Sequence, residues 1–137
     1  MSVLLVSPRG NTFQYHTPRP LRHIIFDRGE DYWSVGSGDC GLEWGDAILS
    51  LAFREPYGFS LQHNGIVGEV GEHGWVAISG NDYAATTELW IGGTPWRIPV
   101  AFFVSREQAW LAVKEFFRTA GRARELKWVP LSDQKWE

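Results

Sequence analysis

The chain has 137 residues and a formal net charge of −3 at neutral pH. At about 150 residues per domain, this length predicts a single domain, 1–137, and excludes a Rossmann enzyme with a separate substrate domain. Apolar residues make up 44% of the chain, close to the roughly 45–50% of ordinary globular proteins, which excludes a disordered chain.

No segment of the sequence is typical of a membrane or secreted protein. The longest apolar run, Ile98–Val104, already contains Pro99, whereas a membrane helix needs roughly 20 apolar residues. Near the start only Val3–Val6 are consecutive apolar residues, too few for a secretory signal. Cys40 is the only cysteine, so an internal disulfide is impossible. We therefore expect a cytoplasmic protein with no membrane partner.

Charge is unevenly distributed along the chain. Residues 1–28 contain four Arg and one Asp, residues 29–90 contain ten acids and one Arg, and residues 91–137 contain eight bases and five acids. Phosphate recognition depends on Lys and Arg, so the acidic centre argues against a nucleic-acid partner. A basic protein is the partner that such a centre would attract. The alternative is that these acids are solvated residues of loops and strand edges.

Most of the sequence is typical of strands, because short β-branched and aromatic segments alternate with Gly, Asn, Asp and Pro. The predicted strands are Ser2–Val6, Arg22–Phe26, Tyr32–Val35, Phe59–His63, Ile66–Val70, Trp75–Ser79, Thr86–Ile91, Arg97–Val104 and Leu126–Val129. Asn64-Gly65 predicts a tight hairpin before Ile66, since both turn residues tolerate positive φ. The segment Leu42–Arg54 is ambiguous: its apolar spacing suits a helix, but Gly45 weakens one.

One helix is predicted near the C-terminus, from about Arg106 to Ala120. Ser105 and Gln108 form a capping-box pattern at its start, and Gly121 is the expected stop because glycine readily adopts a left-handed conformation. The apolar positions recur at helical spacing and form one stripe: Ala109, Ala112, Val113, Phe116, Phe117 and Ala120. Strands followed by one helix predict an α+β fold, in which a twisted, mainly antiparallel β-sheet carries the C-terminal α-helix on one face.

Residues 36–41 match the G-x-G-x-x-G pattern of dinucleotide-binding loops, and Glu55 lies about 20 residues after its start, where a ribose-binding acid would stand. However, Asp39 would place a carboxylate beside the pyrophosphate, and Glu55 precedes Pro56 rather than ending a strand. We therefore interpret Gly36–Gly41 as a glycine-rich surface turn and expect no cofactor.

Catalytic and metal-binding motifs are weak throughout. Cys40 is expected to be a buried or half-buried thiol rather than a nucleophile. The histidines show neither H-E-x-x-H nor C-x-x-C spacing, so no metal site is expected; they are His16, His23, His63 and His73. One enzymatic alternative stays open: Glu72 and His73, placed across a hairpin from His63, would form the general acid–base pair of a small hydrolase. A turn histidine beside a solvated glutamate is the simpler interpretation.

Aromatic residues are abundant, with eight Trp, eight Phe and four Tyr. Core packing is the default interpretation. Strand alternation separates some of them, because Glu88 and Trp90 face outward if Leu89 and Ile91 face the core. An outward Trp beside carboxylates is a suitable anchor for an arginine-rich partner; the alternative is that a second packed face covers Trp90.

The C-terminal third resembles a known family. Residues Val104–Phe117, then Gly121, then Leu126–Trp128 reproduce a helix with an Ala-x-x-x-Phe spacing, a glycine turn and a final strand carrying Trp. This pattern resembles the ending of the first-numbered immunity protein family of bacterial polymorphic toxin systems. The resemblance implies a cytoplasmic antidote, without catalytic residues, that binds and blocks the toxin domain of a secreted effector. Such toxins are often nucleic-acid deaminases.

The acidic centre and the resemblance together lead to a site hypothesis. A toxin that acts on DNA or RNA carries a basic cleft, which carboxylates can occlude in place of phosphates. The hypothesis requires the carboxylates to gather on one surface. The toxin-binding residues it names are Glu69, Glu72, Asp82, Tyr83, Glu88 and Trp90. A further alternative is an interaction adaptor outside any toxin system, and the sequence leaves the oligomeric state open.

Overall fold

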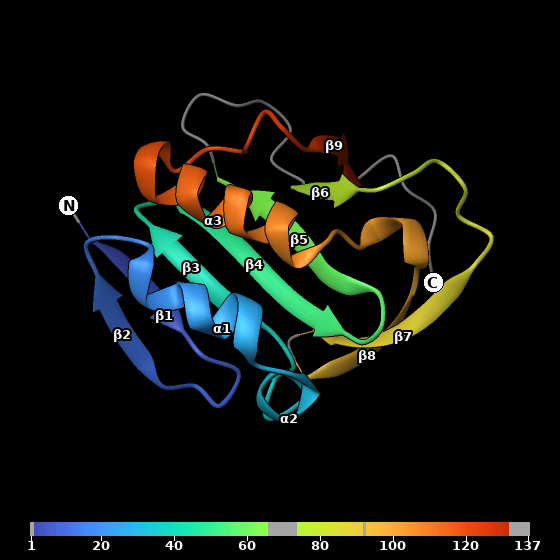
Figure 1. Ribbon diagram of the computed structural model, residues 1–137, viewed down its shortest axis with the longest axis horizontal. Helices are drawn as coiled ribbons and strands as arrows, with labels where there is room; N and C mark the ends of the chain where they lie inside the picture. The colour runs from blue at the N-terminus through green and yellow to red at the C-terminus, as the bar shows by residue number, and fades with distance from the viewer. Residues whose placement is uncertain (1, 66–73, 92, 132–137) are drawn as a thin grey trace.

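Figure 1 shows the computed structural model, which describes residues 2–65, 74–91 and 93–131. The strands in chain order are β1 (Val3–Val6), β2 (Thr12–Tyr15), β3 (Cys40–Trp44), β4 (Ala47–Arg54), β5 (Gly58–Asn64), β6 (Trp75–Ile78), β7 (Thr86–Ile91), β8 (Thr94–Pro99) and β9 (Lys127–Pro130). The helices are α1 (Arg22–Asp27), α2 (Glu30–Trp33) and α3 (Arg106–Thr119), with short 3₁₀ turns η1 (Arg19–Leu21) and η2 (Val100–Phe102). Within the described ranges, no helix is long and apolar enough to cross a membrane.

Seven of the strands form one antiparallel sheet in the order β2-β1-β3-β4-β5-β6-β9, while β7 and β8 form a separate two-stranded hairpin. The C-terminal helix α3 packs on the sheet, and α1 lies beside it on the same face (Figure 1). This arrangement confirms the predicted α+β class. The predicted strands near β1, β5, β6, β7 and β9 are confirmed to within two residues at each end.

The ambiguous segment Leu42–Arg54 is a hairpin of two strands. Trp44 pairs with Ala47 across the two-residue turn Gly45-Asp46, and Gly45 has a φ of +62°, as the first turn residue of a type II′ hairpin requires. Along β4, Ala47, Leu49 and Leu51 are buried, whereas Ile48 is exposed. The pattern therefore has the period of a strand, and glycine serves the turn rather than interrupting a helix.

Helix α3 begins and ends close to the predicted positions. The Ser105 hydroxyl accepts the Gln108 backbone N–H at 3.1 Å, and the Gln108 side-chain oxygen accepts the Ser105 N–H at 3.0 Å, which confirms the capping box. The stop differs from the prediction: Ala120, with a φ of +62°, takes the left-handed conformation, and Gly121 does not. The Ala120 N–H donates to the Phe116 carbonyl, so the helix ends at Thr119, one residue before the predicted end.

Two predicted strands, Arg22–Phe26 and Tyr32–Val35, are wrong, because α1 and α2 occupy these segments. Their β-branched and aromatic composition suggested strands, but Leu21 and Ile25, four residues apart, are both buried, which is the spacing of a helix face. A distant residue completes α1. Arg106 Nη1 donates to the carbonyls of Ile25 at 2.6 Å and Arg28 at 3.1 Å, so carbonyls at the end of this short helix are satisfied by tertiary contact.

Other predicted boundaries also differ. Arg97–Val104 is not one strand, because β8 ends at Pro99 and η2 follows. The edge strand β2 was not predicted. His63 of β5 pairs with Leu49 on one side and with Trp75 of β6 on the other. The predicted tight hairpin at Asn64-Gly65 is therefore wrong, because β6 takes the place beside β5 that a strand directly after that turn would occupy. The predicted strand Ile66–Val70 lies outside the described residues.

The β7–β8 hairpin and η2 cover part of the sheet face opposite the helices. From the hairpin side, Leu89, Ile98, Phe102 and Phe103 are buried, and from the sheet they meet Ala52, Val76 and Ile78 in a second apolar cluster. The first and larger cluster lies between the sheet and α3. The central strands therefore bury both faces, which explains the near-continuous burial from Leu51 to Phe53.

Candidate functional site

The glycine-rich segment, residues 36–41, forms a turn that packs against both the β1–β2 loop and the β7–β8 hairpin. Ser37 N–H donates to the Pro8 carbonyl at 2.9 Å, and Gly93 N–H donates to the Ser37 carbonyl at 2.8 Å. At Gly38, where φ is +87°, an added Cβ would lie 2.6 Å from the Trp90 Cβ and carbonyl oxygen. These glycines thus let the end of the hairpin approach the loop closely, and the backbone groups that would cradle a phosphate contact the protein itself.

Four of the six predicted toxin-binding residues lie on the hairpin or on the turn that precedes it, namely Asp82, Tyr83, Glu88 and Trp90. Glu69 and Glu72 lie outside the described residues. Leu89 is 3% exposed and Trp90 is 46% exposed, which confirms the predicted alternation on β7. No second packed face covers Trp90, so this surface is available to a partner.

Trp96 is a second exposed tryptophan of the hairpin, but it lies on the opposite face from Trp90. It is 43% exposed and pairs directly with Leu89, whereas Trp90 pairs with Pro95. Because directly paired residues of an antiparallel hairpin point to the same face, Trp96 shares the face of Leu89. The outward face therefore carries Trp90 with Glu88, Pro95 and Arg97.

Tyr83 and Asp82 have structural contacts of their own. The Tyr83 ring lies edge-on to Phe102, with ring centroids 5.1 Å apart, and the residue is half-buried. The Asp82 carboxylate accepts the Ala84 backbone N–H at 3.0 Å, the pattern of an Asx turn. Tyr83 thus anchors the approach to β7 against the core, while Asp82 stays exposed at the turn.

Some of the described acids of residues 29–90 lie far apart. Asp46 and Glu55 flank the eight-residue β4, so extended backbone at about 3.3 Å per residue separates them by roughly 25–30 Å. Glu30 accepts the Glu55 N–H at 2.7 Å and lies 3.6 Å from Arg54. Acids that are close in sequence thus fall at opposite ends of an extended strand, and Glu30 and Glu55 do not share one surface with Asp46.

Glu88 also has a cationic neighbour. It pairs across the hairpin with Arg97, whose guanidinium donates to the Thr86 hydroxyl at 3.2 Å. The outward face of the hairpin is thus of mixed charge. Its distinguishing feature is the exposed Trp90 rather than a negative field.

His63, proposed in the hydrolase alternative, lies in the core. It is 0% exposed. Its Nε2 lies 2.8 Å from the Ala120 carbonyl oxygen, to which it donates at the end of α3, and its ring packs edge-on against Phe116 and Trp128. Glu72 and His73 lie outside the described residues. Among the described residues, no group of three or more His, Cys, Asp or Glu side chains could hold a metal ion.

Cys40 is a buried thiol, as predicted. It is 2% exposed, at the start of β3. Burial, with a smaller contribution from the neighbouring Asp39 carboxylate, raises the pKa of the Cys40 thiol to about 12. The thiolate that a nucleophile needs is therefore disfavoured at neutral pH.

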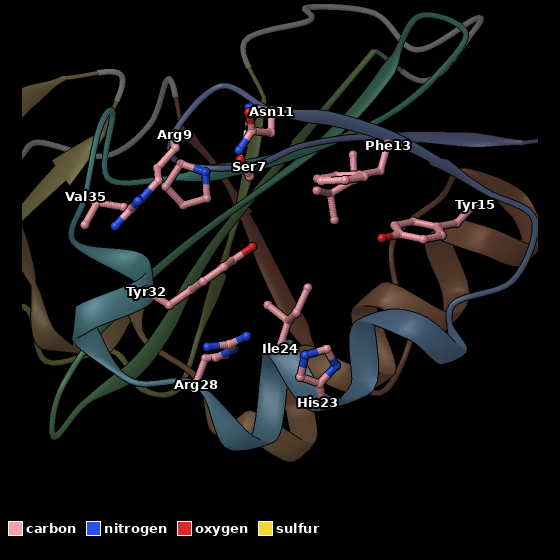
Figure 2. A pocket seen from close by; sticks show the side chains of 12 residues that line it. Ser7, Arg9, Asn11, Phe13, Tyr15, His23, Ile24, Arg28, Tyr32 and Val35 are labelled. Carbon is pink, nitrogen blue, oxygen red and sulfur yellow. Dashed lines mark hydrogen bonds between the residues drawn. The ribbon is translucent and has the colours of Figure 1, made fainter.

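A cavity of about 250 Å³ lies between the β1–β2 hairpin and the α1–α2 segment (Figure 2). Apolar side chains such as Leu5, Phe13 and Ile24 form much of its wall. Two arginines, Arg9 and Arg28, also line it. The sequence analysis recorded the excess of Arg in residues 1–28 but did not identify this site, because its residues come from four separate elements.

Two tyrosines face each other in this cavity. Figure 2 shows the hydroxyls of Tyr15 and Tyr32 pointing into it from opposite sides. The Arg28 guanidinium lies 5.5 Å from the centre of the Tyr32 ring. Burial is the main cause that raises the pKa of Tyr32; Cys40 and Tyr15 add to the rise, and Arg28 opposes it. Tyr32 therefore remains a hydrogen-bond donor at neutral pH.

In comparisons with known proteins, no family model matches this chain, and a search of curated proteins finds no match. The fold and its two surface features define a small α+β domain that presents an aromatic hairpin on one side and an arginine-lined cavity on another.

Proposed function

We propose that this chain is an immunity protein that neutralises a bacterial toxin domain by binding it through the outward surface of the β7–β8 hairpin. The observation that carries the proposal is the exposure of Trp90, at 46%, on the outward face of the hairpin. Tryptophan is enriched among the residues that dominate binding energy at protein interfaces. The resemblance of the C-terminal segment to immunity proteins supplies the class of partner.

The hairpin suits a protein partner. Its inner side is anchored by Leu89 and Ile98 in the second apolar cluster, and its turn is held by the bond from Gly93 to Ser37. The Trp90 ring is therefore presented on a supported scaffold, which lowers the entropy lost on binding. Glu88 lies two residues from Trp90 on the same face of β7, and Asp82 is exposed before the start of β7. Both can pair with Arg or Lys of a basic toxin.

Because the described acids do not all lie on one surface, the aromatic contact rather than a broad negative field is expected to supply most of the affinity. Charge at Glu88 and Asp82 contributes orientation and association rate. This refines the hypothesis drawn from sequence: Trp90 supplies the main contact, and Tyr83 acts by fixing the turn.

The test is coexpression with the toxin domain encoded immediately upstream. The wild-type protein should restore growth and copurify with the toxin. Trp90→Ala should weaken the complex by about 2 kcal/mol, roughly thirtyfold, and Glu88→Lys should slow association. Trp96→Ala, on the opposite face of the same hairpin, should have little effect. Phe13→Ala is the matched control, because Phe13 is an equally exposed ring (47%) on β2, at the far edge of the sheet.

Two results would contradict the proposal: one rejects the function, and the other rejects only the binding site. Wild-type protein that neither rescues growth nor binds the toxin rejects the function and favours an adaptor outside toxin systems. Rescue and binding that survive Trp90→Ala unchanged reject the outward face of the hairpin as the binding site while retaining the function.

A further inference from the structure

We propose that the cavity between the β1–β2 hairpin and α1–α2 is a binding site for a small aromatic carboxylate. This inference does not rest on the proposed toxin-binding function, and the cavity shares no described lining residue with the β7–β8 hairpin.

The walls favour a flat apolar body. Phe13 of β2 faces Ile24 of α1 across the space, and Val35 lies at one end (Figure 2). Leu5 of β1 also lines the cavity. Phe13 is stacked with Tyr15, with ring centroids 6.3 Å apart and an interplanar angle of 18°, so one side offers a nearly coplanar aromatic surface. An aromatic ring that enters this space can bury its faces against apolar atoms on both sides.

The polar groups favour a negative charge at one end of that body. Arg9 and Arg28 bring two guanidinium groups to the lining, and no Asp or Glu is among the described residues that line the cavity. The Tyr15 and Tyr32 hydroxyls, which point into the cavity (Figure 2), are further donors. A carboxylate matches this set, because guanidinium groups bind it through two parallel hydrogen bonds.

The donors are held in position before any ligand binds. The Arg28 side chain lies over the Tyr32 ring, and its carbonyl accepts a bond from Arg106 at 3.1 Å. The turn that carries Arg9 is closed by bonds between Ser7 and Asn11, from Ser7 N–H to the Asn11 carbonyl and from Asn11 N–H to the Ser7 hydroxyl. Such preorganisation reduces the free-energy cost of binding.

Size limits the ligand to one or two rings. The cavity of about 250 Å³ lies just below the roughly 300–1,000 Å³ that is usual for drug-sized ligands. The chemistry therefore points to a compact arene with a single carboxylate.

The experiment compares 2-naphthoate with its neutral analogue 2-naphthamide by isothermal titration calorimetry on the full chain. Naphthoate should bind at least about tenfold more tightly than naphthamide, since the charged bonds are lost in the amide. Arg28→Gln and Tyr32→Phe should each weaken naphthoate binding by about tenfold and leave naphthamide binding little changed. Arg124→Gln, an exposed arginine beyond α3, is the matched control and should have no effect.

Arg9→Gln provides a second test that leaves the contact between Arg28 and Tyr32 intact, so a loss of naphthoate binding there cannot come from a disturbed α2. Circular dichroism of each variant verifies its fold. The proposal is overturned if neither probe binds the wild-type protein, if the two probes bind equally, or if Arg9→Gln and Arg28→Gln both bind naphthoate as the wild type does.

Discussion

Burial decides the chemistry of the two residues that the sequence marked as possible nucleophile and base. Cys40 belongs to the apolar cluster between the sheet and α3. The His63 ring packs against Phe116 of α3, which is part of the same cluster. His63 uses its Nε2–H to satisfy a helix carbonyl, and Cys40 keeps its proton. Their side chains thus serve packing and hydrogen bonding within the fold. The residue type alone does not show this, because a Cys or His in a sequence can be either buried or reactive.

The raised pKa of Cys40 predicts a pH dependence of stability. Below pH 9.0, the ordinary pKa of the thiol, the folded and unfolded chains both hold the proton, so Cys40 makes its full contribution to the free energy of unfolding. Between pH 9 and about 12 the unfolded chain releases the proton and the folded chain keeps it, so the free energy of unfolding falls as pH rises, by up to about 1.4 kcal/mol per pH unit.

Urea unfolding of the wild type and of Cys40→Ala between pH 8 and 11 measures this effect. The variant should lose less stability over that range than the wild type. The pKa of Tyr32 is also raised, mainly by burial and partly by Cys40, so the difference between the two proteins reports the Cys40 thiol together with its interaction with Tyr32. Parallel pH profiles would show that burial does not hold the thiol proton.

At the scale of elements, the glycine-rich turn determines where the hairpin lies. Gly36 approaches the Pro8 carbonyl, where an added Cβ would lie 2.0 Å away, and Gly38 approaches Trp90. The same turn donates to Pro8 and accepts from Gly93. It therefore joins the β1–β2 loop to the β7–β8 hairpin, and a motif that looks like a phosphate loop instead supports a close approach of three segments.

Gly38→Ala should destabilise the protein by about 2 kcal/mol or more, because the new methyl group meets Trp90 and because alanine is strained at positive φ. The fluorescence of the exposed tryptophans should change as the hairpin shifts. Gly41→Ala is the matched control: Gly41 lies in β3 with no atom within 4 Å of the added Cβ, so stability should be nearly unchanged. Equal stability of the two variants would contradict this packing of the turn against the hairpin.

At the scale of the whole molecule, one sheet serves two apolar clusters. Leu51 and Phe53 of β4 face the helices, and Ala52 between them faces the hairpin layer. Because the same strand supports both clusters, loss of either should disturb the other. The two layers are therefore expected to unfold together.

Leu61→Ala, in the helix-side cluster, and Ile98→Ala, in the hairpin-side cluster, test this coupling, since both residues are fully buried. Each substitution should lower the free energy of unfolding by about 2–5 kcal/mol. Far-ultraviolet circular dichroism and tryptophan fluorescence should still report one coincident transition. An early fluorescence transition confined to Ile98→Ala would instead mean that the hairpin layer unfolds separately.

Local periodicity was sufficient for part of this structure. The capping residues and apolar stripe of α3, the alternation that buries Leu89 and exposes Trp90, and the α+β class follow from the sequence by itself. Each depends on residues within one element, whose spacing directly sets which side chains share a face.

Only the tertiary structure decided the rest. Helix α1, with six residues, is too short to be stable alone and depends on Ile25 in the core and on Arg106 from α3. The pairing of Trp96 with Leu89, the separation of the described acids and the arginine-lined cavity all depend on where separate segments meet. Such contacts join residues far apart in the chain, and their positions are set by the packing of the complete fold rather than by any local pattern.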